Sequence, residues 1–446
     1  MSDVQPPRRP VDPGPHPLRE PNTPWNGRVK YRRRAGGFAV RGGPGKTLHR
    51  NQQAAARAAE LTGGTVKAVQ VGEGRAVYIV EFEDSAAASP EHVLDQLRAE
   101  GLDGEENYVM FADPVYANPV YASPVYANPV YANPVYANGY ICGGARPSTA
   151  RPAAQSLEPP TYDTDANECR VVILDTGIAA DESSKGDMNL CPAFLQPLAK
   201  EYVRQWEWPD NSPSDPYLDP VSGHGTFIAG IIQTLTPGTE IVPWSVVTSY
   251  GDVDVVTVVD AINQLHERNL VNEYTVVNMS FSGYADERMD ALQAAVDGLL
   301  EKKAAVVASA GNDATDRPAF PACLPGVVGV AALDRDGPAR YTNHGPWVSA
   351  CAPGTDLVSS FFGWNGPLEV PKMPGSVDPD EYRHWARWTG TSFAGPVVSA
   401  ALVRHMRVTG QNAQEASRHM IEAPGLFRMA GLGTVVNLSM YEPSCL

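Results

Sequence analysis

Three residue types that together perform acyl transfer occur in separate short segments of the chain. They are Asp175 in VVILDTGI, His224 in SGHGTFIAGII and Ser392 in WTGTSFAGPVVSAALV. A serine hydroxyl is a weak nucleophile until a neighbouring base takes its proton, and histidine suits that task near neutral pH. A carboxylate bonded to the histidine holds its tautomer and stabilises its cation. These residues would therefore act together if the fold brings them together.

Each of the three has a local setting that favours such a role. Asp175 follows an apolar run that predicts a buried strand, so it would lie at the carboxyl edge of a parallel sheet. His224 begins an apolar helix between two glycines, which we expect to leave room for a substrate beside the ring. Ser392 opens a helix in which Pro396 is tolerated because it lies in the first turns. Taken singly, a turn aspartate, a structural histidine and a capping serine explain these residues equally well.

Taken together, the blocks DTG, HGT and GTSFAGP resemble, in this order, those of the subtilisin-like serine proteases (subtilases), over roughly residues 165–440. The resemblance implies that Ser392 is the acyl-accepting nucleophile, that His224 is the general base and then the general acid, and that Asp175 orients the imidazole. It also implies the fold class: an α/β, subtilisin-like three-layer αβα domain with a mostly parallel sheet.

Two further segments, VVASAGND and VVNMSFSG, match the same family. The resemblance implies that the Asn312 side chain donates to the oxyanion. It implies further that a substrate lies extended against the second segment, whose end forms a wall of the primary specificity pocket. The substrate-binding residues are then Ser280, Phe281, Ser282, Gly283, Ser309, Ala310 and Gly311. Ser282 replaces the glycine usual at its position, and its hydroxymethyl group would narrow or polarise that pocket.

The elements that must position these residues follow from the apolar pattern. Continuous apolar runs predict strands that are buried on both faces, and amphipathic segments between them predict helices. The expected strands are 171–174, 241–247, 275–279, 304–308 and 327–331, and the expected helices are 254–266 and 288–300. Strands that alternate with helices predict a mostly parallel sheet covered on both sides.

A smaller α+β unit is predicted before this domain, over residues 36–113. The pattern predicts strands at 38–41, 66–71, 77–82 and 108–111 and helices at 51–61 and 90–99, the second with Ser89 as N-cap and Pro90 at its first position. The order βαββαβ is typical of a ferredoxin-like domain. Because subtilases are commonly preceded by such a domain, the resemblance implies a propeptide that assists folding and fills the substrate cleft with its C-terminal segment.

The chain falls into four parts on this interpretation: a disordered, basic, Pro-rich arm at 1–35, the propeptide-like domain at 36–113, a linker at 114–160 and the peptidase domain at 161–446. The linker carries five copies of Pro-Val-Tyr-Ala, which start at Pro114, Pro119, Pro124, Pro129 and Pro134. A proline at every fifth residue excludes helix and central strand, so we expect an extended tether.

Composition restricts the partners. The net charge of −16 argues against a nucleic-acid-binding protein. No apolar stretch is long enough to span a membrane, and the first residues lack the apolar segment of a secretory signal, so we expect a cytoplasmic protein, with non-standard export as the alternative. We also expect a monomer. The expected partners are a peptide or protein substrate and the chain's own propeptide.

No cofactor is expected. Asp210, Asp215 and Asp219 lack the dense spacing of a calcium loop, although calcium there stays an alternative. The cysteines show no CxxC spacing, so zinc is not expected. If the protein meets an oxidising compartment, Cys323 and Cys351 are the pair we expect to form a disulfide.

Three hypotheses of function remain. The first is a serine endopeptidase made as a self-processing zymogen. The second is a peptide-binding pseudoprotease, which the joint presence of Asp175, His224, Asn312 and Ser392 disfavours. The third is a dedicated peptide-maturation protease that uses the repeat tether as its own substrate.

Overall fold

The computed structural model describes residues 30–34, 37–41, 45–83, 88–112, 148–149, 169–179, 206–207, 221–249, 251–285, 288–365 and 381–436. A large sheet forms its centre, in the order β12-β9-β14-β16-β17-β19-β23-β22, with β18 paired to β17. Its strands are β9 (Arg170–Asp175), β12 (Glu240–Ser245), β14 (Thr275–Met279), β16 (Ala305–Ser309), β17 (Val327–Asp334), β18 (Gly337–Pro338), β19 (Ala350–Pro353), β22 (Arg428–Met429) and β23 (Gly433–Val435).

All neighbours from β12 to β23 are parallel, and only β18 and β22 pair antiparallel. The order reverses at β9, since β12 lies on one side of it and β14 on the other. Open α/β sheets form their crevice at such a reversal, outside the carboxyl ends of the strands. Asp175 is the last residue of β9, so it lies at this crevice.

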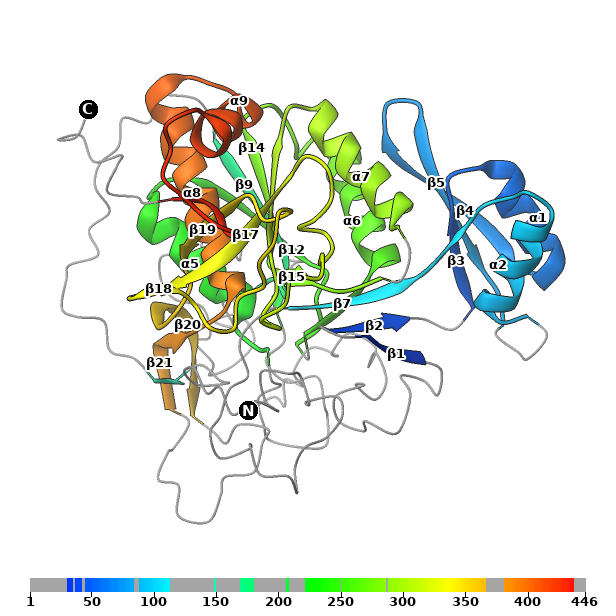
Figure 1. Ribbon diagram of the computed structural model, residues 1–446, viewed down its shortest axis with the longest axis horizontal. Coiled ribbons are helices and arrows are strands. Elements are labelled where there is room, and N and C mark those ends of the chain that lie inside the picture. Colours follow the sequence, from blue (N-terminus) through cyan, green and yellow to red (C-terminus); the bar gives the residue numbers. More distant parts are fainter. Residues whose placement is uncertain are drawn as a thin grey trace, which may run out of the picture.

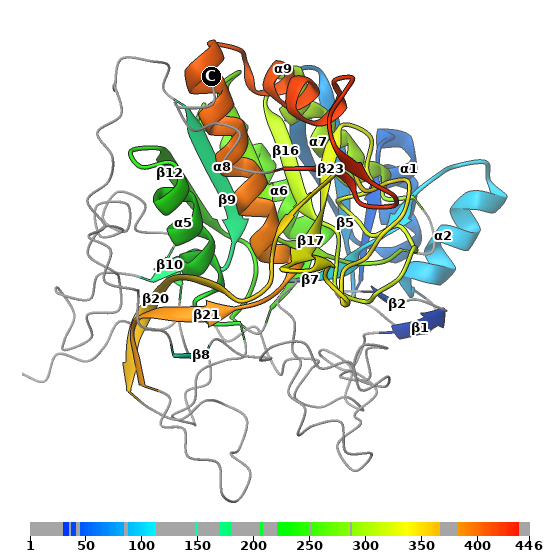
Figure 2. The ribbon, with the colours of Figure 1, turned by 60° about the vertical axis from the view of Figure 1, so that its left-hand side comes forward.

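Helices cover both faces of the sheet (Figures 1 and 2). One face carries α5 (His224–Leu235) and α8 (Thr391–Thr409), and the other carries α6 (Val255–Glu267) and α7 (Asp290–Glu301). Successive residues of β9 alternate between the two cores: Val171 and Ile173 pack with α5 and α8, whereas Val172 and Leu174 pack with α6 and α7. The continuous apolar runs are explained by this double burial, and the predicted strands and helices of the large domain are confirmed.

The large domain also carries shorter elements outside its central sheet and its four long helices. They are α9 (Ala413–Ser417), the π-helix η5 (Arg418–Glu422), the pair β10 (Ile178–Ala179) and β11 (Trp206–Glu207), and a hairpin of β20 (Leu357–Asn365) and β21 (Glu381–Trp388). The short strand β8 (Ser148–Thr149), within the predicted linker, pairs with β21. No helix among the described residues is both long and apolar enough to cross a membrane.

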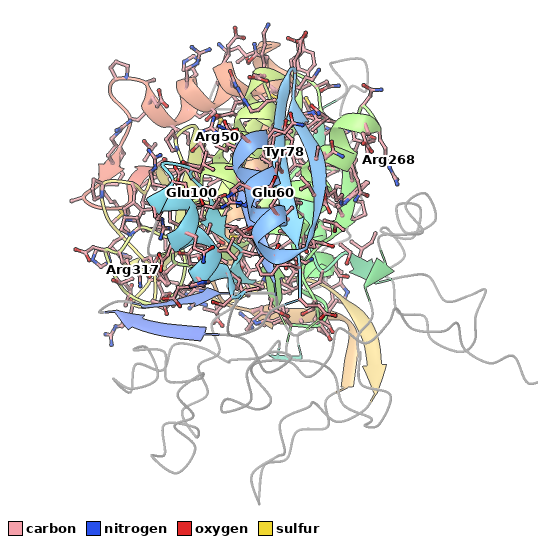
Figure 3. All side chains as sticks on the ribbon, turned by 90° about the vertical axis from the view of Figure 1, so that its right-hand side faces the viewer. Arg50, Glu60, Tyr78, Glu100, Arg268 and Arg317 are labelled. Atoms are coloured by element: carbon pink, nitrogen blue, oxygen red, sulfur yellow. The ribbon has the colours of Figure 1, made fainter. Side chains whose placement is uncertain are left out.

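The smaller α+β domain consists of β3 (Lys46–His49), α1 (Gln52–Thr62), β4 (Thr65–Gly72), β5 (Arg75–Glu81), α2 (Pro90–Ala99) and β6 (Glu105–Glu106). Its sheet has the order β4-β5-β3-β6 and is antiparallel throughout. Ser89 caps α2 and Pro90 begins it, as predicted. The two helices lie on the outer face that Figure 3 presents, where Glu60 and Glu100 approach each other because Arg57 binds both carboxylates.

Two strands of the predicted βαββαβ unit were assigned wrongly. The predicted first strand, 38–41, belongs to β2 (Gly37–Arg41), which pairs with β1 (Lys30–Arg34) and with β7 (Tyr108–Ala112) instead of entering the domain's sheet. The predicted last strand, 108–111, is β7 itself, which leaves the domain. In chain order, β3 is the first strand of the domain's sheet and β6 is the last. Residues 30–34 are a strand although the prediction placed them in a disordered arm; the rest of that arm lies outside the described residues.

The α+β domain docks on the outer side of α6 and α7 (Figure 1). Lys67 of β4 forms an ion pair with Asp260 of α6 at 2.7 Å, and Arg75 of β5 forms one with Glu301 of α7 at 2.6 Å. The closest approach is at Gly298 of α7, where an added Cβ would lie 1.5 Å from the carbonyl oxygen of Val71. The glycine therefore lets helix and strand backbone touch.

The predicted pairing of Cys323 with Cys351 is wrong. Both are free thiols. Cys351 lies in β19 opposite Ala331, well inside β17, whereas Cys323 lies in the turn before β17 begins. Burial raises the pKa of each thiol to about 12, so both stay protonated at neutral pH.

Gly298→Ala tests the docking. Alanine favours a helix over glycine by about 1 kcal/mol, so α7 itself should not suffer. The added methyl group would however collide with Val71. We therefore expect the α+β domain to dock less tightly on α6 and α7. In a Ser392→Ala background, which removes the candidate nucleophile, hydrogen exchange should show faster exchange of the β7 amides. Glu301→Ala, which removes only an exposed ion pair, should cost about 0.2–1 kcal/mol and leave these amides protected. Equal protection in Gly298→Ala and the parent would contradict the docking contact.

Candidate active site

Asp175 and His224 form the centre of the site. Nδ1 of His224 donates to Oδ1 of Asp175 at 2.7 Å, and the backbone N–H of Thr176 donates to the same oxygen at 2.8 Å. Both side chains are fully buried. Because the carboxylate accepts at Nδ1, the neutral imidazole carries its proton there, which leaves Nε2 as the basic nitrogen.

The glycines beside His224 serve a different purpose from the predicted one. A Cβ at Gly225 would lie 2.0 Å from the carbonyl oxygen of Gly177, and one at Gly223 would lie 2.0 Å from the ring of Phe361. The backbone N–H of Gly225 also donates to the hydroxyl of Thr176 at 2.9 Å. Gly225 therefore lets the start of α5 approach the turn after β9 closely, Gly223 lets it approach Phe361, and the expected space for a substrate is filled by protein.

Aromatic rings surround the imidazole of His224. The ring of Trp388, at the end of β21, lies perpendicular to it at 5.6 Å, and that of Phe393, in α8, lies tilted at 5.2 Å. Phe227 packs against both of these rings. The contacts restrict rotation of the imidazole, and they exclude water, which strengthens its bond to Asp175.

Ser392 lies in the first turn of α8 and is fully buried. Its hydroxyl donates to the carbonyl oxygen of Ser280 at 3.0 Å, while the Ser280 hydroxyl donates to the carbonyl oxygen of Ser392 at 2.8 Å. Among the described residues Nε2 of His224 has no hydrogen-bond partner. The serine hydroxyl is thus turned toward Ser280, and a change of its rotamer would be needed to engage the histidine.

Asn312 is held in one orientation by Thr391. Its Oδ1 accepts from the backbone N–H and from the hydroxyl of Thr391, both at 3.0 Å. That hydroxyl accepts in turn from the backbone N–H of Gly311 at 3.2 Å. Because Thr391 binds Oδ1, the NH2 group of the Asn312 side chain points away from Thr391. Asn312 is therefore oriented to donate a hydrogen bond.

The predicted substrate edge is occupied by the chain's own β7. This strand runs antiparallel to β15 (Phe281–Ser282) on one side and to β13 (Asp252–Asp254) on the other. Ala112 lies opposite Phe281, and its backbone N–H donates to Gly251 at 2.7 Å. A Cβ at Gly283 would lie 2.9 Å from Met110. The structure therefore places Phe281, Ser282 and Gly283 against an extended strand, as a substrate edge requires.

The other predicted residues line the neighbouring strand end. Ser309 is the last residue of β16, and Ala310 and Gly311 follow it. Because β14 and β16 are parallel neighbours, this segment leaves the sheet at the same edge as Ser280. Gly311 faces Ser282 across the gap: a Cβ on it would lie 2.9 Å from the Ser282 hydroxyl. The structure thus brings all the predicted site residues to one edge of the sheet.

Sequence reasoning missed the residues that hold β7 in place. Glu105 accepts from the backbone N–H groups of Asp290 and Ala291, at the start of α7, both at 2.6 Å. Asn107 accepts from the backbone N–H of Val256 at the start of α6. A short acidic segment between elements carries no sign that it caps a helix in another domain. Thr391 was missed as well, although it stands directly before the nucleophile.

Comparison with known proteins agrees with this geometry. Residues 166–424, more than half of the chain, match the subtilase family, Peptidase_S8. This chain belongs to the subtilase family. A thermophilic serine proteinase of Bacillus sp. (strain AK1) is 28% identical over 250 residues, which are 53% of this chain and 54% of the relative. Thermitase of Thermoactinomyces vulgaris is 25% identical over 278 residues, 59% of this chain and 83% of thermitase.

The same fold occurs in a solved structure. Fervidolysin from Fervidobacterium pennivorans, a keratinolytic enzyme related to subtilisin, aligns with a TM-score of 0.55 at 20% identity, over 92% of this chain and 62% of fervidolysin. The subtilisin-like fold class is thereby confirmed. The chain spans about half the length of the Bacillus relative.

Metal ligands are not apparent in the described part of the chain, where no cluster of three His, Cys, Asp or Glu residues is placed to hold an ion. The calcium candidates Asp210, Asp215 and Asp219 lie outside the described residues. The expectation that no cofactor is used, the calcium alternative and the cytoplasmic location therefore stay predictions.

Glu105 makes the docking of the α+β domain, and with it the placement of β7, sensitive to pH. Its carboxyl is buried at the domain boundary, and this desolvation outweighs the two N–H donors, so that its pKa is raised from 4.5 to about 8. A group whose pKa is raised on docking takes up a proton on docking. Docking should therefore be strongest below pH 4.5 and should weaken as the pH rises through 8.

The test is thermal unfolding of the uncut Ser392→Ala chain between pH 5 and pH 9. We expect the unfolding temperature of the α+β domain to fall across this range and to fall less in a chain that also carries Glu105→Gln. Because all other titrating groups are shared, the difference between the two slopes isolates Glu105. Identical slopes would contradict the assignment.

Proposed function

We propose that this chain is a serine endopeptidase that hydrolyses peptide bonds through an acyl-enzyme. The observation that carries the proposal is the buried Asp175–His224 hydrogen bond at the sheet edge where Ser392 and Asn312 also lie. A site used only to bind peptides would need neither a nucleophile nor an oriented amide donor. The thermophilic serine proteinase of Bacillus sp. (strain AK1), named above as a relative, supports the same chemistry.

The proposed first step uses Nε2 of His224 as the base. The Ser392 hydroxyl turns from Ser280 to Nε2 and transfers its proton there as Oγ attacks the carbonyl carbon of the scissile bond. The oxyanion so formed accepts from the Asn312 amide and from the backbone N–H of Ser392, which in the first helical turn has no intrahelical acceptor. His224 then gives the proton to the leaving amine, and the C–N bond breaks.

The second step reverses the roles with water as the nucleophile. His224 takes a proton from water, the hydroxide adds to the acyl carbon, and the bond to Ser392 Oγ breaks as the serine regains its proton. Asp175 stays ionised throughout and stabilises the imidazolium through the 2.7 Å bond. The product acid leaves, and the site returns to its starting state.

We further propose that the α+β domain is a propeptide that holds the enzyme as a zymogen. The pairing of β7 with β13 and β15 supports this, because a substrate needs the same backbone groups. With β7 in place, Ser392 rests on Ser280 and not on His224. The partners of the active form are then a peptide or protein substrate and this domain.

Two alternatives remain to be tested. A pseudoprotease would bind peptides on the β15 edge and never cut them. A dedicated maturation protease would cut its own repeat tether, residues 114–140, which lie outside the described residues. Both alternatives bind a peptide along the β15 edge, as the leading proposal does. They differ from it in whether the bound chain is cut and in which chain is cut.

Substitutions at the centre of the site test the mechanism. Ser392→Ala should lower turnover by at least about 10³-fold, since the nucleophile is gone. Asn312→Ala should cost less, about 10²–10³-fold, and act mainly on kcat. The measurement is hydrolysis of a casein or peptide-library substrate. Gln264→Ala, an exposed residue of α6, should keep full activity. A loss for Ser392→Ala below about 10³-fold would contradict a triad mechanism.

The Pro-Val-Tyr-Ala array is the predicted site of zymogen cleavage. From the sequence we expect its prolines to favour an extended chain, so that little ordering entropy is lost on docking, and five copies would raise the local concentration beside the site. Terminal sequencing of freshly folded enzyme should find mature chains that begin within residues 114–140. Changing every Tyr-Ala to Gly-Ser should shift or abolish these ends. Unchanged processing near Pro160 would mean that the array is only a spacer.

A further inference from the structure

Pro396 deprives the helix that carries the nucleophile of one hydrogen-bond donor. In an α-helix each carbonyl oxygen accepts from the backbone N–H four residues later, and proline has no N–H. Pro396 stands four residues after Ser392 in α8, so the helix cannot supply this donor to the Ser392 carbonyl oxygen. The ring of a proline also crowds the carbonyl group four residues before it. Because Ser392 is fully buried, its carbonyl oxygen needs a partner from the protein.

The Ser280 hydroxyl supplies that partner. Ser280 follows directly after β14, and its hydroxyl donates to the carbonyl oxygen of Ser392 at 2.8 Å. In the opposite direction the Ser392 hydroxyl donates to the carbonyl oxygen of Ser280 at 3.0 Å. The proposed first step breaks the second of these bonds, when Oγ turns to His224, and leaves the first intact. The Ser280 hydroxyl can therefore hold the backbone of Ser392 while the side chain rotates.

Asn278 determines where the proton of the Ser280 hydroxyl points. The side-chain amide of Asn278 donates through Nδ2 to Oγ of Ser280 at 2.9 Å. A hydroxyl has a single proton to give, and with an N–H donor on this side the proton is directed to the Ser392 carbonyl. If the amide were turned over, its oxygen would take the proton and the carbonyl of Ser392 would lose its donor. The orientation of the amide therefore matters to the nucleophile.

Ser399 fixes the orientation of that amide. It lies in α8 about two turns after the nucleophile, and its hydroxyl donates to Oδ1 of Asn278 at 3.0 Å. The same hydroxyl also lies 3.2 Å from the carbonyl oxygen of Gly395, the acceptor that a serine inside a helix commonly uses. Since Oδ1 of Asn278 accepts from Ser399, Nδ2 is the group that faces Ser280.

The position of Asn278 is unfavourable for the fold alone. It lies within β14 and shares a sheet face with Val276, which belongs to the apolar core beneath α8. Asparagine is depleted in strands, and a buried amide is destabilising unless it is hydrogen-bonded. Asn278, Ser280 and Ser399 are all fully buried, and their bonds to one another satisfy the amide at both ends. This polar chain in an apolar core therefore favours a role in the site.

We propose that the Ser280 hydroxyl replaces the helical donor that Pro396 removes and thereby positions the nucleophile Ser392. Asn278 and Ser399 act through Ser280, because they orient its proton. The inference rests on the proposed endopeptidase activity and adds three positioning residues, whose side chains take no part in the proton transfer. A displacement of about 1 Å near the reacting atoms can cost about 10²-fold in rate, so the effect should fall on kcat.

The first test is a double-mutant cycle of Ser280→Ala and Pro396→Ala in the full chain. Ser280→Ala removes the donor, and kcat for a peptide substrate should fall at least about tenfold while KM changes little. Pro396→Ala places a backbone N–H where a helix would donate to Ser392. In the Pro396→Ala background, the loss caused by Ser280→Ala should therefore shrink to less than about threefold. Reactive sites are counted with a fluorophosphonate.

The second test concerns Ser399. Ser399→Ala frees the Asn278 amide to turn over and should lower kcat about threefold or more, whereas Ser399→Thr keeps a hydroxyl and should restore most of the loss. In a Ser280→Ala background, Ser399→Ala should have no further effect, because the proton that it orients is gone. Ser360→Ala is the matched control and should leave kcat unchanged, since this buried serine of β20 has no hydrogen-bond partner in the described part of the chain.

The outcomes separate this inference from the proposed function. A chain that is labelled and hydrolyses peptides supports the inference if Pro396→Ala rescues Ser280→Ala and Ser399→Ala lowers kcat. A labelled, active chain overturns the inference, and leaves the endopeptidase intact, if Ser280→Ala keeps kcat, changes only KM or costs equally in both backgrounds. If a member of the first cycle does not fold, equal kcat in Ser399→Ala and the parent overturns the inference, and a loss that Ser399→Thr restores supports it. A chain with neither label nor hydrolysis overturns both.

Discussion

The hydrogen bond between Asp175 and His224 is the contact on which the rest of the site depends. A buried carboxylate is costly unless it is paired, and here it accepts from the imidazole and from the Thr176 backbone while its own strand lies in the middle of a parallel sheet. The bond forms because the start of α5 touches the turn after β9, which Gly225 alone permits. The site is therefore built by close backbone approach as much as by the three reactive side chains.

A second constraint comes from the edge beside this bond. Strands β13 and β15 are not part of the large sheet, and β7, which follows the α+β domain, pairs with both. The same short stretch of chain caps two helices of the large domain, through Glu105 and Asn107. Docking and inhibition are thus one event in our account: the polar groups that anchor the domain also deliver a strand to the position that a substrate would take. Strand β2 pairs with the first residues of β7, Tyr108 and Val109, and β1 pairs with β2 in turn.

Much of this could be predicted, and the failures have physical reasons. The core strands were predictable because both faces of β9 and β14 are buried, which demands continuous apolar runs. An alternating run such as 38–41 indicates a strand without indicating its partner, so β2 was given to the wrong sheet. The purpose of Gly223 and Gly225 depends on Phe361 and Gly177, which are distant in sequence. Likewise Glu105 looks like a solvated acid until α7 is placed against it.

The central claim is that Asp175, His224 and Ser392 form one working catalytic unit. Its most direct test is covalent labelling of the folded, processed protein with a fluorophosphonate, followed by mass mapping of the modified peptide. The account predicts a single adduct on Ser392, lost in His224→Ala although that variant keeps its fold. A folded protein that takes no label, or takes it at another serine, would contradict the account and favour a pseudoprotease.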